Sequence, residues 1–329
     1  MSIHQTAFPV KYFLIAAAII GCGRESDKPL TKQQPGLEKT ESIESPVPSF
    51  NGEKALEQLK QIVSFGPRNP NSPGHEKCIG FLVTKLRSLA DDVRTQDFVH
   101  KGYEKETLRL GNVIAAFNPE NKDRLLLCTH WDTRPRAERD SDPERWNTPI
   151  PGANDGASGV AVLLEIASLL KSSKPRIGVD LVFFDGEDYG YEGDVANYLL
   201  GSRHFARAKE PDYLPRFGIL LDMVGDAQLD ILKEEYSLRF APDVVDLVWK
   251  KAAELGFTQF IDAQGEAITD DHLPLNEAGI RTIDLIDFAY PDESHRYWHT
   301  HDDTPDKCSA ESLEAVGTVL THIVYTQLP

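Results

Sequence analysis

Cysteine and positive charge are both scarce in this 329-residue sequence, and each shortage excludes a class of protein or site. Only four cysteines occur, and no two are spaced as Cys-x-x-Cys, which excludes a thiolate metal site of that kind. The 35 lysines and arginines are outnumbered by 52 aspartates and glutamates, so the net charge is -17 and the pI is near 5.0. Nucleic acids and anionic membrane surfaces bind basic patches, so we expect neither as a partner.

Long apolar runs are also lacking, and the most apolar stretch, residues 12–22, is too short to span a membrane as a helix. It follows Lys11, and a charged flank before a short apolar run predicts a signal peptide over residues 1–22. The stretch ends in Ile19-Ile20-Gly21-Cys22, which resembles a bacterial lipobox. An ordinary signal peptide with an incidental cysteine is the alternative. We expect an exported protein that lipid on Cys22 anchors to a bacterial membrane, on its periplasmic or cell-surface side.

The remaining chain divides into a tether and one folded domain. Residues 23–50 are rich in Ser, Pro, Glu, Lys and Gln, which predicts a disordered tether. Residues 51–329 show no linker and no internal repeat, and strand-like runs alternate there with helical patterns. This alternation predicts a single α/β domain with a doubly wound, mostly parallel twisted sheet flanked by helices. We favour a monomer, although the sequence does not determine the oligomeric state.

Acids and histidines follow several predicted strands at the point where each strand ends. They are His130 with Asp132, Glu187 with Asp188, Asp222, and, in nearby loops, Asp155, Asp271 and His299. The carboxyl ends of parallel strands meet at one edge of a sheet, so we expect these groups to converge there. So many like charges require a cation. Imidazoles with carboxylates are the ligands expected for zinc, and their scattered spacing excludes the helix-borne His-Glu-x-x-His motif.

Three of these residues have roles that the pattern alone leaves open. His130 taken alone is typical of a buried, hydrogen-bonded histidine. Asp155 also fits the N-cap of the helix that follows it, because its glycine-rich flanks suit both a cap and a metal ligand. Asp132 is predicted to orient His130 by accepting a hydrogen bond on the side away from the metal.

Seven short motifs spread over nearly all of residues 51–329 resemble the zinc aminopeptidase-like family that includes the animal-type and bacterial glutaminyl cyclases. Several are weak individually, but jointly they are highly specific. In the family's order they are Phe65-Gly66-Pro67-Arg68 with Asn71-Ser72-Pro73-Gly74-His75, His130-Trp131-Asp132-Thr133-Arg134-Pro135, Gly152-Ala153-Asn154-Asp155-Gly156-Ala157-Ser158-Gly159, Phe183-Phe184-Asp185-Gly186-Glu187-Asp188, Gly201-Ser202-Arg203-His204, Asp270-Asp271-His272-Leu273-Pro274 and Trp298-His299-Thr300.

The resemblance implies roles for the strongest motif residues. Asp155, Asp188 and His299 match the positions that hold zinc, and Glu187 matches the general acid/base. Asp188 departs from the family pattern, since animal cyclases and many peptidases have glutamate there. Aspartate also binds zinc but has a shorter reach, so the departure bears on the backbone spacing more than on the metal.

Further implied roles concern a second metal and the substrate pocket. His130 and Asp222 match the positions that hold a second zinc in the family's peptidases, with Asp155 as the bridge. One zinc ion is therefore expected, and two are the alternative. Asp222 and Asp271 match active-site acids, and Trp298 matches an aromatic residue of the substrate pocket.

The implied reaction is the conversion of an N-terminal glutamine of a peptide or protein into pyroglutamate, with release of ammonia. The family's peptidases commonly have tyrosine in place of Trp298 and a single acid in place of Asp270-Asp271, so both features favour a cyclase. The alternative is a metal-dependent aminopeptidase that uses the same residues to hydrolyse the first peptide bond. A non-catalytic binding module of the same fold would need gaps in the ligand set, and the sequence has none.

Overall fold

The computed structural model describes residues 47–326. The expected signal peptide, the lipobox and nearly all of the expected tether lie outside the described residues. The ring of Phe50 is buried against Gly317, so the packed core begins at the start of the described chain. Within this part of the chain, no helix has the length and apolar character needed to cross a membrane.

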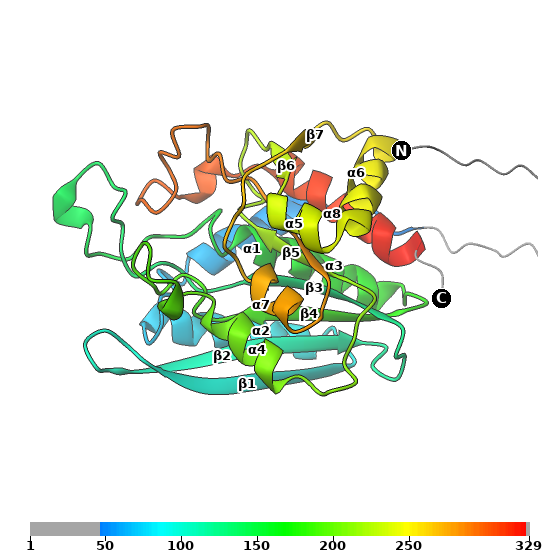
Figure 1. The fold of residues 1–329 in the computed structure, drawn as a ribbon, viewed down its shortest axis with the longest axis horizontal. Helices are drawn as coiled ribbons and strands as arrows, with labels where there is room; N and C mark the ends of the chain where they lie inside the picture. The colour runs from blue at the N-terminus through cyan, green and yellow to red at the C-terminus, as the bar shows by residue number, and fades with distance from the viewer. Residues whose placement is uncertain (1–46, 327–329) are drawn as a thin grey trace, which may run out of the picture. The chain divides into compact units, whose positions relative to one another are not determined.

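A six-stranded sheet forms the centre of the fold (Figure 1). From one edge to the other its strands are β1 (Asp92–Lys101), β2 (Thr107–Phe117), β4 (Gly178–Phe184), β3 (Arg124–His130), β5 (Gly218–Asp222) and β8 (Thr282–Ile286). The strands β1, β2 and β4 pair antiparallel, whereas β4, β3, β5 and β8 pair parallel. A small second sheet pairs β6 (Ile231–Lys233) with β7 (Phe260–Gln264).

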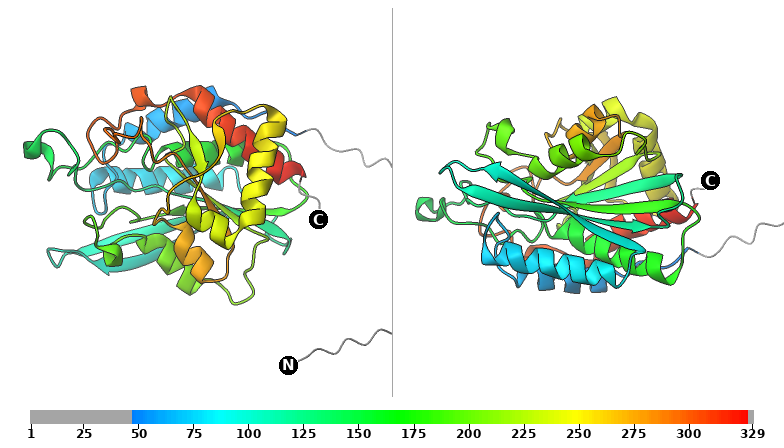
Figure 2. Two further views of the ribbon diagram at one scale, coloured as in Figure 1. Left: turned by 45° about the horizontal axis from the view of Figure 1, so that its top comes forward. Right: turned by 90° about the horizontal axis from the view of Figure 1, so that it is seen from below.

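Helices cover both faces of the large sheet, as the two views in Figure 2 show. One layer contains α1 (Gly52–Val63), α2 (Pro73–Arg87), α3 (Ser158–Ser172), α6 (Pro242–Leu255) and α8 (Ala310–Thr326). The opposite layer contains α4 (Leu200–Ala208) and α7 (His272–Glu277), while α5 (Glu235–Phe240) contacts the edge strand β8. The chain is thus a single mixed α/β domain with a mostly parallel central part, which confirms the predicted fold class.

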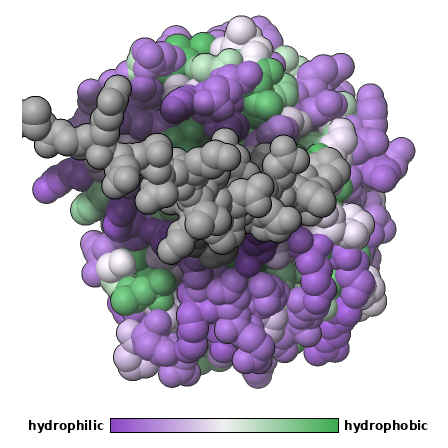
Figure 3. All heavy atoms as spheres, turned by 90° about the vertical axis from the view of Figure 1, so that its right-hand side faces the viewer, coloured by the Kyte–Doolittle hydropathy of each residue, from purple (hydrophilic) through white to green (hydrophobic). Residues whose placement is uncertain are grey.

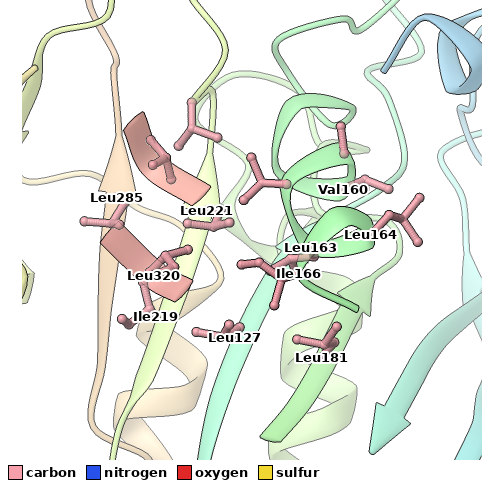
Figure 4. Close-up of a cluster of buried hydrophobic side chains, with 14 of the residues drawn as sticks. Leu127, Val160, Leu163, Leu164, Ile166, Leu181, Ile219, Leu221, Leu285 and Leu320 are labelled. Atoms are coloured by element: carbon pink, nitrogen blue, oxygen red, sulfur yellow. The ribbon is translucent and has the colours of Figure 1, made fainter. Parts of the chain in front are cut away.

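Burial on both faces explains why the central strands are almost uniformly apolar. Leu127 of β3 and Leu181 of β4 point toward α3, where Leu163 and Ile166 meet them (Figure 4). The neighbouring residues along each strand face the other way; Leu126, for example, belongs to a core cluster with Phe205 of α4 and Leu275 of α7. Because a strand with two buried faces has no solvent side, it shows a continuous apolar run in place of alternation.

Two short elements of the fold were not expected from the sequence. The strand β6 and the helix α5 were not predicted, because segments of three and six residues carry too little periodicity to recognise. The strand β7 begins at Phe260, several residues after α6 ends at Leu255. The reason is that Gly256 ends α6 with a positive φ of 82°, and the chain needs a further turn before it becomes extended.

The molecular face drawn in Figure 3 is mostly hydrophilic, with small and separate hydrophobic patches. Large apolar side chains that are exposed, such as Val99, Leu214 and Phe240, come from distant parts of the sequence.

The packing around α3 generates a test of the core. Replacing the fully buried Leu163 with alanine should lower the free energy of unfolding by about 2–5 kcal/mol, because the change removes buried methyl groups and leaves a cavity. Urea denaturation measures this change. The control is Leu214→Ala. Leu214 is 60% exposed, so this substitution should change the free energy of unfolding by less than about 0.5 kcal/mol. Equal effects of the two substitutions would contradict the packing described above.

Candidate active site

Five of the predicted residues meet beyond the carboxyl ends of β3, β4 and β5, in two groups that share Asp155. His130, Asp155 and Asp222 form one group, and the ligand atoms in each group lie within 4.8 Å of one another. His130 Nε2 lies 3.2 Å from Asp155 Oδ1 and 3.0 Å from Asp222 Oδ1. In the other group, His299 Nε2 lies 3.7 Å from Asp155 Oδ2 and 3.5 Å from Asp188 Oδ1. The two oxygens of Asp155 therefore face two different histidines.

The backbone before α3 holds Asp155 away from the helix. The helix begins at Ser158, and its N-cap residue is Ala157, which has no capping side chain. The N-cap interpretation of Asp155 is therefore wrong. A turn at Gly156, with φ of 94°, separates Asp155 from the helix, and an added Cβ there would collide with the backbone of the loop after β3. Asp303 Oδ2 accepts a hydrogen bond from the Asp155 N–H at 3.2 Å. The Asp155 carboxylate is thereby free to face the two histidines.

Asp132 connects the end of β3 to the turn after β4. Its carboxylate accepts hydrogen bonds from the backbone N–H groups of Glu187 at 3.0 Å and Asp188 at 3.4 Å. Its Oδ1 is also 3.6 Å from His130 Nδ1, which is longer than a hydrogen bond. In this structure Asp132 therefore fixes the backbone that carries Glu187 and Asp188, while it lies beside the histidine that it was predicted to orient.

Arg68 is a supporting residue whose role the sequence did not reveal. Its buried guanidinium donates hydrogen bonds to the carbonyl oxygens of Trp131, Pro151 and Gly152 at 3.0, 3.0 and 2.6 Å. These carbonyls belong to the loop after β3 and to the loop that leads to Asp155. Arg68 therefore holds the two loops together, and its place in the Phe65–Arg68 motif was the only signal of this in the sequence.

Arg134 is a second residue that sequence reasoning did not place in the site. It is fully buried, and its Nη1 donates to Asp188 Oδ1 at 2.5 Å. Its Nε donates to Glu138 Oε2 at 2.9 Å, so the guanidinium bridges two carboxylates. Arg134 had a signal in the sequence, because it belongs to the motif that begins at His130. It fixes the shorter side chain of Asp188, the residue that departs from the family pattern.

Two non-glycine residues at the site have left-handed backbone conformations. Met223, directly after Asp222, has φ of 49°, and His299 has φ of 55°. Such conformations cost about 1–3 kcal/mol each and persist where the surrounding structure holds them. The two strained positions therefore orient the side chains of Asp222 and His299 at a cost in local stability.

Glu187 lines a cavity of about 380 Å³ beside the two groups. Its side chain is 12% exposed, and its Oε2 lies 4.0 Å from His130 Nδ1. Burial, together with the neighbouring Asp188 carboxylate, raises the pKa of Glu187 well above its usual range. A carboxyl group with a raised pKa exchanges protons more readily near neutral pH, as a general acid/base requires.

The two acids before His272 differ in position. Asp270 lines the cavity, and burial with the nearby Asp222 raises its pKa to about 7. Asp271 is fully buried, and its Oδ1 accepts a hydrogen bond from Ser202 Oγ at 2.5 Å. Burial and the adjacent Asp270 raise the pKa of Asp271 well above its usual range. Asp271 was predicted to be catalytic, but Asp270 is the acid that lines the cavity.

Trp298 forms an aromatic wall of the cavity. Its ring is stacked on His299, with centroids 3.9 Å apart, and the ring of Phe288 meets it edge-on at 4.9 Å. Val195 and Tyr198, from the segment after Asp188 that the sequence left unassigned, also line the cavity. The cavity is therefore partly aromatic and strongly acidic.

The titration of the grouped residues tests whether they suit a cation. Burial raises the pKa of Asp188 well above its usual range and also raises that of Asp222. Burial lowers the pKa of His130, but contacts with three carboxylates outweigh it and raise the pKa well above normal. Burial and nearby arginines lower the pKa of His299. The ionised forms of Asp188, Asp222 and His299 are thus disfavoured, whereas the carboxylates around His130 favour its protonated form. A divalent cation would favour ionised carboxylates and neutral imidazoles at all of these positions. The donor set fits zinc.

A mostly parallel α/β domain with imidazole and carboxylate ligands at the carboxyl edge of its sheet defines a metal-dependent enzyme of the exopeptidase type. This chain belongs to peptidase family M28, whose sequence profile matches residues 112–324. The family and the fold agree with the resemblance found in the sequence.

Individual relatives include both peptidases and cyclases. Aminopeptidase YwaD of Bacillus subtilis is 28% identical over 289 residues, or 83% of this chain, and the match spans 57% of the length of that relative. The glutaminyl-peptide cyclotransferase of Bos taurus is 24% identical over 303 residues, which cover 79% of this chain and 78% of that protein.

Solved structures show the same two kinds of neighbour. The glutaminyl cyclase of Bacteroides thetaiotaomicron is 41% identical with a TM-score of 0.82, and the match covers 86% of this chain and 100% of that one. A Zn-dependent exopeptidase from Parabacteroides distasonis is 38% identical with a TM-score of 0.82, and this match also covers 86% of this chain and 100% of that one. Together with the two ligand groups, these similarities support zinc as the metal of this site.

The geometry around His299 generates a test of metal binding. His299→Ala should weaken zinc binding by at least about 100-fold. Loss of a residue that only hydrogen-bonds to a metal ligand already lowers metal affinity about 10–100-fold, and loss of the ligand itself should cost more. Competition with a chromophoric zinc chelator measures the affinity without reference to activity. The control is His322→Ala, in the half-buried part of α8, which should leave the affinity unchanged. Unchanged zinc affinity in His299→Ala would rule out the ligand assignment.

Proposed function

We propose that this protein is a zinc-dependent glutaminyl-peptide cyclotransferase that converts the N-terminal glutamine of peptides and proteins into pyroglutamate and releases ammonia. The observation that carries the proposal is the stacking of Trp298 on His299 at the cavity that Glu187 lines. The 41% identity with a bacterial glutaminyl cyclase, over 86% of the chain, supports it. Asp155, Asp188 and His299 are the proposed ligands of one zinc ion.

The proposed reaction forms one carbon–nitrogen bond and breaks another. Zinc, when bound, supplies a Lewis acid that polarises the γ-carboxamide carbonyl of the substrate. Glu187 accepts a proton from the α-amine as that nitrogen attacks the carboxamide carbon, and returns it to the departing amide nitrogen, which leaves as ammonia. Trp298 packs against the glutamine side chain and holds it in the cavity.

An aminopeptidase is the second candidate, and one observation favours it. Both ligand groups are complete and share Asp155, as a two-zinc site requires, with His130 and Asp222 as the additional ligands. In that case Glu187 would activate a water molecule against the first peptide bond. The two reactions use the same residues and differ in the nucleophile, so they must be separated by their products.

The products from a glutamine-leading peptide test the proposal. The zinc-loaded protein should release ammonia from the peptide and leave it 17 mass units lighter, about the mass of one ammonia molecule lost on cyclisation. Coupled ammonia detection and mass spectrometry measure the two changes. Release of free glutamine without ammonia would show that the aminopeptidase proposal is the correct one.

The matched variant in this experiment is Glu187→Gln. It should reduce kcat by about 10²–10⁴-fold, because it removes the group that transfers the proton, while zinc content stays equal to that of the unmodified protein. Zinc analysis of the same preparation separates loss of proton transfer from loss of the metal. Activity close to normal in this variant would refute the role of Glu187.

We also propose that the protein is exported and that lipid on Cys22 anchors it to a bacterial membrane. The apolar stretch that ends in Ile19-Ile20-Gly21-Cys22 supports this proposal. Cys22→Ser should move the protein from the membrane fraction to the soluble fraction of a bacterial host, because the substitution removes the site of lipidation. Fractionation and mass spectrometry of the mature N-terminus measure the change. Membrane attachment that persists in Cys22→Ser would contradict a lipid anchor at this residue.

A further inference from the structure

Three arginines of the loop after β3 bond to the segment after β4, namely Arg134, Arg136 and Arg139. Their partners follow in the same order, at residue 188, at residues 189 and 190, and at residue 192. The first two arginines are buried, whereas the side chain of Arg139 is 43% exposed. Arg139 is therefore the outermost of three contacts that join the two loops.

The guanidinium of Arg139 contacts an acid and an aromatic ring. Its Nη2 donates to Glu192 Oε1 at 2.8 Å, and its Cζ lies over the ring of Trp298, 4.8 Å from the ring centroid. A guanidinium within about 6 Å of an aromatic centroid is attracted by the negative face of the ring. The backbone N–H of Arg139 also donates to the carbonyl oxygen of His299 at 3.4 Å. Two separate groups of Arg139 thus contact the pair of residues 298 and 299.

The aromatic neighbours of Trp298 belong to its own loop. The ring is half-buried; it stacks on His299 and meets Phe288 and His295 edge-on, with centroid distances of 3.9, 4.9 and 6.4 Å. All three neighbours lie in the loop after β8, so they move with Trp298 and do not fix it relative to the rest of the cavity. Arg139 comes from the loop after β3, and its contact does fix the ring relative to another loop.

The partner on the other side, Glu192, stands at the cavity as well. It adjoins Gly193, which lines the catalytic cavity together with Trp298. Arg139 therefore links two parts of the cavity wall that leave the sheet at different strands. Both contacts are partly open to solvent, so each is modest in strength. They orient side chains more than they stabilise the fold.

We propose that Arg139 is a positioning residue whose guanidinium holds the Trp298 ring in the orientation that binds the glutamine side chain of the substrate. This inference rests on the proposed function and adds a residue to the machinery of the same site. Arg139 itself lies outside the lining of the cavity, so it acts on the substrate through Trp298. Contacts of Trp298 with the glutamine stem are alike in the bound substrate and in the transition state, so misplacing the ring raises KM and spares kcat.

Arg139→Gln tests the inference in the steady-state release of ammonia from a glutamine-leading peptide by the zinc-loaded protein. The KM should rise about 2–5-fold, the size that one cation–π contact at an exposed site supports, because the ring then leaves the binding orientation for part of the time. The kcat should stay within about twofold, and zinc affinity should be unchanged.

The matched control is Arg145→Gln. Arg145 lies in the same loop, has a side chain that is 47% exposed, and pairs with Asp140 at 3.5 Å. Its substitution removes the same charge at a similar exposure, and it should leave KM unchanged. A rise of equal size in this control would make the effect one of net charge and overturn the inference.

The same substitution in a Trp298→Leu background tests whether Arg139 acts through the ring. Without an aromatic ring there is no cation–π contact, so Arg139→Gln should change kcat/KM there by a factor close to one. If Trp298→Leu releases too little ammonia to measure, Trp298→Phe replaces it. Its smaller ring keeps less of the contact, so the factor should be lower than in the unmodified protein.

Each outcome has a distinct meaning. An unchanged KM in Arg139→Gln overturns the inference while the proposed function stands. A change in kcat/KM that is undiminished after Trp298 is replaced shows that Arg139 acts by another route, and it also overturns the inference. Loss of zinc affinity in Arg139→Gln would place the effect on the ligand His299, with the same consequence. Absence of ammonia from the unmodified protein overturns the proposed function and the inference with it.

Discussion

Carboxylates that face one another in a buried position are the constraint on which the rest of this structure depends. Asp155, Asp188 and Asp222 meet beyond the strand ends with only two histidines among them. Like charges removed from water repel one another and lose hydration, so the arrangement is costly unless a cation joins it. The fold therefore has to hold these groups in place by means other than their own interactions, and binding of zinc contributes stability as well as chemistry.

Buried polar residues behind the acids supply that support. Arg68 joins the loop after β3 to the loop before α3, and Asp132 joins the end of β3 to the turn after β4. Asp303 accepts hydrogen bonds from the backbone around Asp155 and from the hydroxyl group of Tyr290. Each of these residues is fully buried and acts on the backbone, so the ligand side chains are positioned by rigid loops at the edge of the sheet.

The departure at Asp188 has a structural counterpart in Arg134. Aspartate reaches less far than glutamate, and the guanidinium of Arg134 fixes its Oδ1 within 3.5 Å of His299 Nε2. Arg134 also partly neutralises the carboxylate, which reduces the repulsion that Asp188 and Asp155 exert on each other. The charge on the ligand set is thus lowered on the side of the site where Arg134 lies.

The sequence by itself determined the fold class and the set of acids and histidines, because buried strands have distinctive apolar runs and the motifs stand directly after them. It also identified Trp298, which lines the cavity. Only the tertiary structure decided that Asp270, more than Asp271, lines the cavity and that Arg134 pairs with Asp188. Such facts depend on contacts between residues more than 50 positions apart and on side-chain direction, and no local pattern encodes either.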